Sequence, residues 1–239
     1  MANKLTPTEF LYGCSIDPEV QELRPDYRAL LLVAEGLERH DGSTVADGLI
    51  SHAEAHASGL LASTPVDQLP QISAWRDAYR GFGAKPQRTR NSLEALTRRA
   101  ATGLPRVNAL TDIYNAISVL HQIPLGGEDF DCYEGPARLA RATGDEDFDT
   151  TAAGAPVTEH PEPGEVIWRD DRAVTCRRWN WRQGQRTALS GDTTTAFFIL
   201  DSLAPMGIQE LNEAGDALGR ALESLGTSVQ ISQRMAGAQ

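Results

Sequence analysis

The first half of the chain carries one strand pattern followed by helical patterns. Tyr27–Glu35 is a continuous apolar run that ends at Gly36, which predicts a buried strand. After Ser43, a helix is expected whose face holds Val45, Leu49, His52, His56 and Leu60. Three more helices are predicted, running from Pro70 to Gly81, from an Asn91 cap to Gly103, and from Asn108 to the break at Pro124.

Strand patterns dominate the second half. They predict a hairpin of 165–169 and 172–178, a buried strand over 194–200, a helix over 211–225 and a short strand over 228–231. Asp145–Pro163 is acidic and then proline-rich, which indicates an exposed loop. Helices followed by strands, without regular β-α-β alternation, predict an α+β fold.

Composition narrows the class of protein. A length of 239 residues, 41% hydrophobic and 23% charged, suits one globular unit spanning residues 1–239. No stretch approaches a membrane span, and Met1–Lys4 opens no secretory signal. The cysteines at 14, 132 and 176 are too scattered for a disulfide framework or a structural zinc site. We therefore expect buried thiols in a cytoplasmic protein.

The net charge of −11 argues against broad binding to DNA or other nucleic acids, but the charge is uneven. Basic residues cluster in two stretches, 76–106 and 169–186. Either stretch is a solvated arginine-rich surface or a local face for phosphate on a body that otherwise repels it.

Most familiar catalytic motifs are missing. His52 and His56 could share a metal at i and i+4, but Glu54 is misplaced for the zinc-protease motif and no further ligand is evident. No GxSxG elbow and no glycine-rich nucleotide motif occur. No cofactor and no metal are expected.

One predicted helix has a notable polar face. Asp112, Asn115 and Ser118 recur every three residues and are expected to point the same way. They either face solvent or form the wall of a polar pocket that a loop over 124–131 completes.

The second unusual segment is Trp179-Asn180-Trp181-Arg182. As a strand it would place both tryptophans on one side and Asn180 and Arg182 on the other. The tryptophans then belong to a core, and the polar pair faces solvent or a ligand. An arginine fork suits carboxylate or phosphate.

Across these segments the chain resembles a known module, the third and fourth domains of the bacterial phenylalanyl-tRNA synthetase beta subunit in free-standing form. The run R-V-N-A-L-T-D-I-Y-N-A-I-S-V-L-H-Q-I-P-L-G-G-E-D-F-D is similar to the synthetase helix V-D-V-T-N-Y and its segment Q-P-L-H-A-F-D. The motifs W-R-x-A-Y-R-x-F-G-x-K-P, G-E-V-I-W-R-D and C-R-R-W-N-W-R also fit. The resemblance covers about residues 70–203 and implies a mixed or antiparallel sheet flanked by helices.

In the synthetase this module hydrolyses tyrosine wrongly attached to the phenylalanine tRNA. The resemblance implies a hydrolase acting in trans on an aminoacyl-tRNA, with no aminoacylation. Such editing uses a positioned water, because an aminoacyl ester is already activated and needs only orientation and a polarised carbonyl.

Residue by residue, the resemblance assigns the catalytic asparagine to Asn115. The implied substrate-binding residues are Tyr114, Gly126, Asp129, Trp179, Asn180, Arg182 and Asp201. The implied tRNA-binding residues are Arg80, Lys85, Arg88 and Arg90. Tyr114 stands where the synthetase has threonine, Gly126 where it has histidine and Asp201 where it has glutamate, while Trp179–Arg182 replaces a glycine-rich turn.

Three functions follow from this pattern. The first is deacylation of mischarged tRNA, with residues 76–106 contacting the acceptor end. The second is a non-catalytic module that binds an amino acid, its derivative or tRNA. The loss of the synthetase histidine and the acidic net charge favour this second function. The third is an enzyme that uses aminoacyl-tRNA as a donor for a small product.

Overall fold

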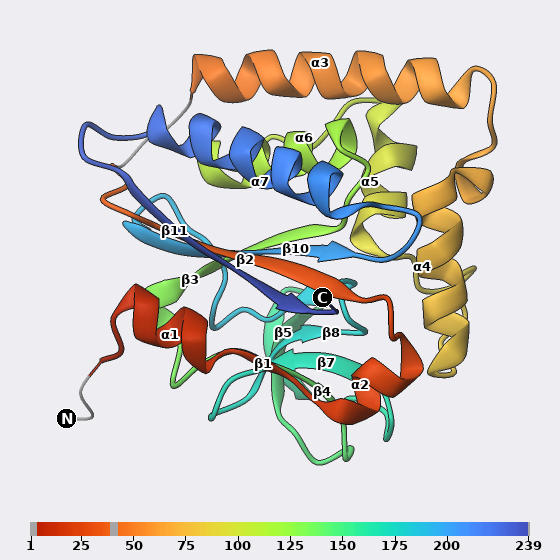
Figure 1. Ribbon diagram of the computed structural model, residues 1–239, viewed down its shortest axis with the longest axis vertical. Coiled ribbons are helices and arrows are strands. Elements are labelled where there is room, and N and C mark those ends of the chain that lie inside the picture. The colour runs from red at the N-terminus through yellow and green to blue at the C-terminus, as the bar shows by residue number, and fades with distance from the viewer. Residues whose placement is uncertain (1–3, 39–42, 239) are drawn as a thin grey trace.

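The protein is built on two large β-sheets and a layer of helices (Figure 1). A computed structural model describes residues 4–38 and 43–238. Met1–Asn3, on which part of the expectation about a secretory signal rests, lie outside the described residues. The predicted α+β class, with mixed and antiparallel sheets flanked by helices, is confirmed.

The central sheet has four antiparallel strands in the order β11, β2, β10, β3. Their bounds are Gln230–Gly237, Arg28–Glu35, Thr195–Ser202 and Leu125–Asp129. The strands predicted at 27–35 and 194–200 are therefore confirmed. The last strand is longer than expected, because its polar residues pair with β2 along its full length.

Helices cover one face of the central sheet (Figure 1). They are α3 (Thr44–Leu61), α5 (Ser92–Ala100), α6 (Ala109–Leu120) and α7 (Ile208–Glu223). Ser43, Asn91 and Asn108 each accept a hydrogen bond from a backbone amide three residues on, so the predicted helix starts are correct. The buried face of α3 was predicted wrongly: it holds Ala46, Ile50, Ala53 and Ala57, small residues that let α3 pack closely on α6.

The second sheet lies against the other face and has five strands in the order β1, β4, β7, β8, β9. Their bounds are Ser15–Ile16, Arg138–Arg141, Val166–Arg169, Val174–Arg177 and Arg182–Gln183. β1 runs parallel to β4 and the remaining pairs are antiparallel. The predicted hairpin around Asp170-Asp171 is β7–β8.

Short helices close the ends of this sandwich. They are α1 (Pro7–Gly13), α2 (Pro18–Leu23), α4 (Pro70–Gly81), η1 (Val66–Gln68) and η2 (Phe130–Cys132). The predicted bounds of α4 are confirmed. Phe10, Tyr27, Trp75 and Trp179 are fully buried where these helices meet the two sheets, so this aromatic core fixes how the layers sit.

Three sequence expectations are corrected. The expected loop over 145–163 contains a hairpin, β5 (Phe148–Ala152) with β6 (Ala155–Glu159), closed by a left-handed Ala153-Gly154 turn. The expected loop over 124–131 is mostly β3, an edge strand of the central sheet. Cys132 is exposed, because it lies in η2 at the surface, whereas Cys14 and Cys176 are buried.

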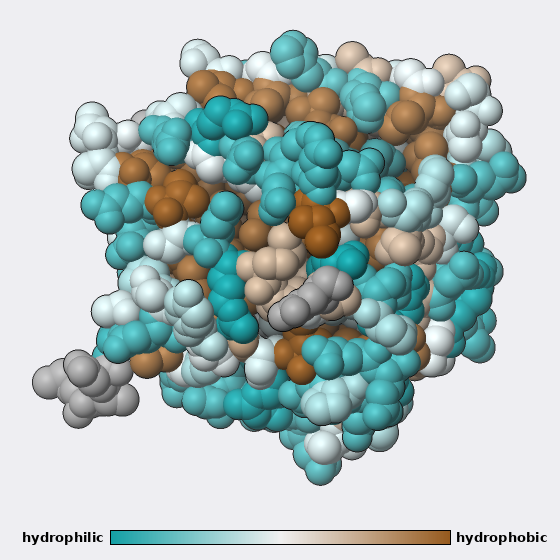
Figure 2. Space-filling view, in the orientation of Figure 1, coloured by the Kyte–Doolittle hydropathy of each residue, from teal (hydrophilic) through white to brown (hydrophobic). Residues whose placement is uncertain are grey.

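The surface in Figure 2 is mainly hydrophilic, with hydrophobic residues gathered along the edge formed by α3. Within residues 4–38 and 43–238, no helix combines the length and the apolar character that crossing a membrane requires.

Candidate functional site

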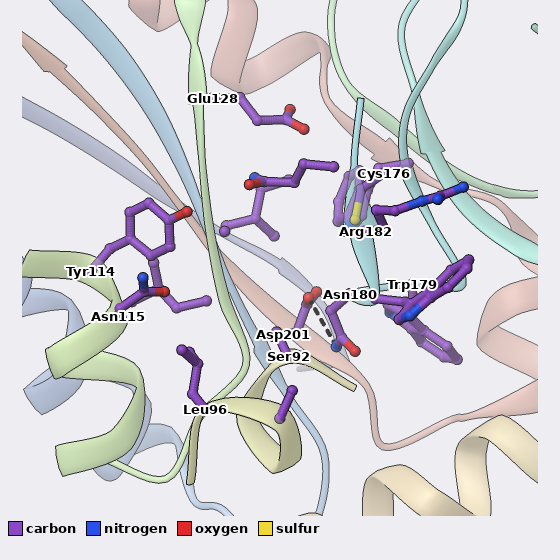
Figure 3. A pocket seen from close by; sticks show the side chains of 17 residues that line it. Ser92, Leu96, Tyr114, Asn115, Glu128, Cys176, Trp179, Asn180, Arg182 and Asp201 are labelled. Carbon is purple, nitrogen blue, oxygen red and sulfur yellow. Dashed lines mark hydrogen bonds between the residues drawn. The ribbon is translucent and has the colours of Figure 1, made fainter. Parts of the chain in front are cut away.

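A pocket lies where the two sheets meet α5 and α6 (Figure 3). Its cavity volume is about 230 Å³, below the usual range for drug-sized ligands and suited to a group of amino-acid size. Of the substrate-binding and catalytic residues named from the sequence, all but Asp129 line it. The cavity thus joins residues that are far apart in the sequence, such as Tyr114 and Asp201.

Helix α6 contributes Tyr114 and Asn115 to one wall (Figure 3). Asn115 is only 7% exposed, yet no described residue forms a hydrogen bond with its side chain. Its amide is therefore available to a ligand, as donor and as acceptor.

The neighbouring polar residues of α6 have structural roles. Asp112 accepts from the Val107 amide at 2.8 Å, and Ser118 donates to the Ile123 carbonyl at 2.6 Å. The polar face predicted from the sequence therefore does not form a pocket wall as a whole, because local capping bonds occupy these two side chains.

Opposite α6, residues 178–181 form a turn between β8 and β9, so the strand alternation predicted for Trp179–Arg182 is wrong. Arg178 and Trp179 have φ values of 47° and 67°, in the left-handed region that costs non-glycine residues roughly 1–3 kcal/mol each. Trp179 consequently enters the core between Tyr27 and Trp75, whereas Trp181 stays half-buried at the pocket edge. Glycine would adopt this turn without strain.

A chain of buried hydrogen bonds holds Asn180 and Asp201. The Tyr79 hydroxyl donates to Asn180 Oδ1 at 2.9 Å, Asn180 Nδ2 donates to Asp201 Oδ2 at 3.2 Å, and the Tyr27 hydroxyl donates to Asp201 Oδ1 at 2.6 Å. All four groups are buried. The floor of the pocket is thereby fixed before any ligand binds.

The pocket contains two carboxyl groups whose pKa values are raised by burial. Burial raises the pKa of Asp201 to about 7, although bonds from Tyr27 and Asn180 oppose the shift. Burial likewise raises the pKa of Glu128 to about 8, and its carboxyl contacts the Tyr133 hydroxyl. Carboxyls that titrate near neutrality can give or take protons, as catalytic and selective sites require.

Sequence reasoning missed Glu128, Gln183 and Ser92, which also line the pocket. A strand assignment for 125–129 would have found Glu128, since alternation puts it on the same side as Gly126. The same alternation turns Asp129 away: its carboxylate accepts from the Asp131 amide at 2.9 Å and the Thr193 hydroxyl at 2.7 Å.

Gln183 takes up the space beside Gly126. A Cβ at position 126 would lie 2.9 Å from Gln183 Nε2, which donates to the Gly127 carbonyl at 3.0 Å. The space beside the glycine that the resemblance aligns with the synthetase histidine is thus filled by a side chain from β9.

Neither a thiolate nor a metal site is evident at the pocket. Burial raises the pKa of the Cys176 thiol well above its ordinary value, so this lining cysteine stays protonated. Among the described residues, no three histidine, cysteine or acidic side chains are grouped as a metal site would require. His52 and His56 lie on the exposed side of α3.

The two basic stretches differ in how their charges are balanced. Each of the six arginines in 169–186 has an acidic partner, and Arg182 pairs with Glu159 while lining the pocket. In the other stretch Arg80 pairs with Asp77, whereas Lys85, Arg88 and Arg99 have no ion-pair partner in the described parts of the chain. Arg88 and Arg90 line a surface hollow that borders the pocket.

A family model for the B3/4 domain matches residues 74–216, more than half of the chain and all of the pocket. The chain belongs to the B3/4 domain family. That family comprises the editing domain of the phenylalanyl-tRNA synthetase beta subunit, so the resemblance drawn from the sequence is confirmed.

A crystal structure of an N-terminal fragment of the phenylalanyl-tRNA synthetase beta subunit from Pyrococcus horikoshii is similar over 93% of this chain, at 13% identity and a TM-score of 0.46. This B3/4 protein spans 53% of that fragment. No curated protein sequence matches the chain.

Proposed function

We propose that this B3/4 protein deacylates mischarged tRNA in trans. The observation that carries the proposal is Asn115: a buried amide with no hydrogen-bond partner among the described residues, facing a cavity of amino-acid size. Its Nδ2 is suited to donate to the ester carbonyl oxygen, where negative charge develops when water attacks. Family membership supports this class of reaction, and the residues that line the pocket support its location.

The proposed reaction is hydrolysis by water. The water oxygen bonds to the acyl carbon, the bond from that carbon to the ribose oxygen breaks, and the ribose hydroxyl leaves with a proton. The amino acid departs as a carboxylate, and the second proton of the water passes to the solvent. A water mechanism suits this pocket, because the Cys176 thiol beside it is held protonated and supplies no nucleophile.

The pocket floor is proposed to select the amino acid. Asp201 and Asn180 present fixed polar groups towards the cavity, and Trp179 and Tyr114 supply aromatic wall. Asp201 is shorter than the glutamate of the synthetase and Tyr114 is larger than its threonine, so the amino acid removed is expected to differ from tyrosine. The residues proposed to contact tRNA are Arg80, Lys85, Arg88 and Arg90. Asp129 points away from the cavity and bonds to Thr193, so any effect on substrate binding is proposed to be indirect.

The test is a panel of tRNAs, each carrying a different non-cognate amino acid, with release of the amino acid as readout. At least one ester is expected to disappear faster than the blank. Asn115→Ala should slow that reaction by about 10²-fold to 10³-fold, the effect of losing one oxyanion donor. The matched control is Asn212→Ala, at an exposed asparagine of α7. Hydrolysis of no ester, or equal rates for both variants, would contradict the proposal.

One observation favours a second function, a non-catalytic module that binds an aminoacyl group. The resemblance aligns Gly126 with the synthetase histidine, and the Gln183 amide fills the space beside this glycine. That amide already donates a hydrogen bond to the Gly127 carbonyl. This function predicts saturable binding of an amino acid amide, measured by calorimetry, without turnover of any ester.

A further inference from the structure

Beside the pocket lies an open hollow whose rim is almost entirely arginine. Arg88, Arg90, Arg98 and Arg99 line it, together with Ala95 and Trp181. Ala95 and Trp181 also line the pocket, so the two cavities share a wall. A single ligand can therefore occupy both by passing over these two residues.

The positive charge of this arginine hollow is only partly neutralised by the described residues. Arg90 and Arg98 share one carboxylate with the buried Arg76: Glu94 Oε1 lies 3.7, 2.9 and 2.8 Å from their guanidinium nitrogens. Arg88 and Arg99 have no acidic partner within the described residues. The hollow is thus a local positively charged surface on a chain whose net charge is −11.

The dividing wall is held in place from within. The Arg178 and Arg182 guanidiniums lie over the Trp181 ring, 4.5 and 4.7 Å from its centroid. Both arginines are anchored by carboxylates, Arg178 to Glu165 and Arg182 to Glu159. Such cation–π contacts fix the indole between the two cavities.

We propose that the arginine hollow binds the phosphodiester group next to the 3′-terminal nucleotide of a single-stranded RNA end. The terminal ribose lies over Ala95 and Trp181, and its acyl group enters the pocket. This inference rests on the proposed function, and it adds Arg98 and Arg99 to the RNA-binding residues while leaving Arg80 outside the subsite. Arginine forks suit phosphate oxygens, which they bind through two hydrogen bonds.

The charge pattern favours an RNA end over a longer duplex contact. A body of net charge −11 repels a polyanion everywhere except at a local cationic site, so contact is limited to a few phosphates. The pocket next to the hollow admits only a group of amino-acid size, which requires a flexible, single-stranded terminus.

The experiment measures binding of uncharged tRNA, and of a short RNA with the same 3′ end, by fluorescence anisotropy at several salt concentrations. Arg99→Glu is the test variant and Arg220→Glu is its matched control. Both residues are exposed arginines in the last turn of a helix, and neither forms an ion pair in the described structure. Melting temperatures of both variants check that each is folded.

Arg99→Glu is expected to weaken RNA binding by about tenfold and to lower the salt slope by about 1, while Arg220→Glu binds as the wild type does. Equal effects at both positions, or none at Arg99, would overturn the proposal. So would a free mononucleotide that binds as tightly as the RNA.

The outcomes separate this inference from the proposed function. Uncharged RNA carries no ester, so its binding is measured independently of deacylation. If tRNA esters are hydrolysed but Arg99→Glu changes no RNA affinity, the inference fails and the proposed function stands. If Arg99→Glu weakens RNA binding and no ester is hydrolysed, the subsite stands and the proposed function fails.

Discussion

Asn180 Nδ2 donates a hydrogen bond to Asp201 Oδ2 at 3.2 Å, linking the turn after β8 to strand β10 at the floor of the pocket. Asp201 forms no ion pair with any described residue; its two oxygens accept hydrogen bonds from the Tyr27 hydroxyl and the Asn180 amide. The protonation of Asp201 is therefore governed by burial, and this has a measurable effect on stability.

The pH dependence of stability should reveal the two buried carboxyls. Their pKa values are raised in the folded state, from 3.8 to about 7 for Asp201 and from 4.5 to about 8 for Glu128. The folded state thus holds these protons more tightly than the unfolded state. Their contribution to stability is fully present below about pH 4 and is lost as the pH rises towards 8. Urea unfolding of Asp201→Asn between pH 5 and 8 should show a smaller decline than the wild type.

Asp216→Asn provides the comparison for this experiment, because Asp216 is an exposed carboxyl on α7. Its decline with pH should match that of the wild type. A slope for Asp201→Asn that equals the wild-type slope would show that Asp201 is ionised throughout this range.

Two adjacent glycines should respond differently to alanine. A Cβ at Gly126 would meet the flexible end of Gln183, 2.9 Å away, whereas one at Gly127 would lie 2.7 Å from the buried Phe198 ring. Gly127→Ala should therefore lose about 1–3 kcal/mol of unfolding free energy, and Gly126→Ala less than about 1 kcal/mol. Gly126→Ala should instead alter ligand binding, because Gln183 must move. Urea unfolding checks both, and a larger loss for Gly126→Ala would contradict the assignment of the two faces.

Glu94 should be a major stabilising carboxylate. It is completely buried and is the only acidic partner of the buried Arg76 among the described residues. Glu94→Gln removes the charge and leaves Arg76 uncompensated, which should cost about 3–5 kcal/mol. Asp77→Asn is the control, since the exposed Asp77–Arg80 pair should contribute less than about 1 kcal/mol. Similar losses for the two variants, measured by urea unfolding, would disprove the difference.

The Tyr79 hydroxyl beneath the pocket floor should contribute to the stability of the fold. Tyr79→Phe leaves Asn180 Oδ1 buried without its donor, at a cost of about 1–3 kcal/mol. Tyr12→Phe, at a tyrosine that is 74% exposed, should change little. Thermal unfolding distinguishes them, and an unchanged melting temperature for Tyr79→Phe would mean that Asn180 reorients to find another donor.

Much of the fold could be predicted from local signals in the sequence. Asn91 and Asn108 marked helix starts correctly, because capping is a property of a few adjacent residues. The cap at Asn91 is not completed by a return bond from Glu94, because the Glu94 carboxylate pairs with three arginines, two of them exposed neighbours and one from α4. That outcome depends on how helices pack, which spacing alone does not contain.

The candidate site was less predictable for the same reason. Asn115 and Asp201 were found through family resemblance, whereas Gln183 reaches the pocket only because β9 passes beside β3. The hairpin β5–β6 was missed because its strands carry few apolar residues. These strands are defined by their pairing across the Ala153-Gly154 turn and not by an apolar pattern.

The left-handed turn at Arg178 and Trp179 joins two regions that usually vary independently in proteins. Trp179 is anchored among the aromatic rings of the interior, and the next residue, Asn180, lines the pocket. A substitution at Trp75 or Tyr27 that shifts Trp179 therefore also shifts Asn180 at the pocket, because one peptide unit joins these two residues. Among relatives of this chain, changes in the aromatic interior should accompany changes in the amino acid that is accepted, so that core sequence and ligand preference evolve together.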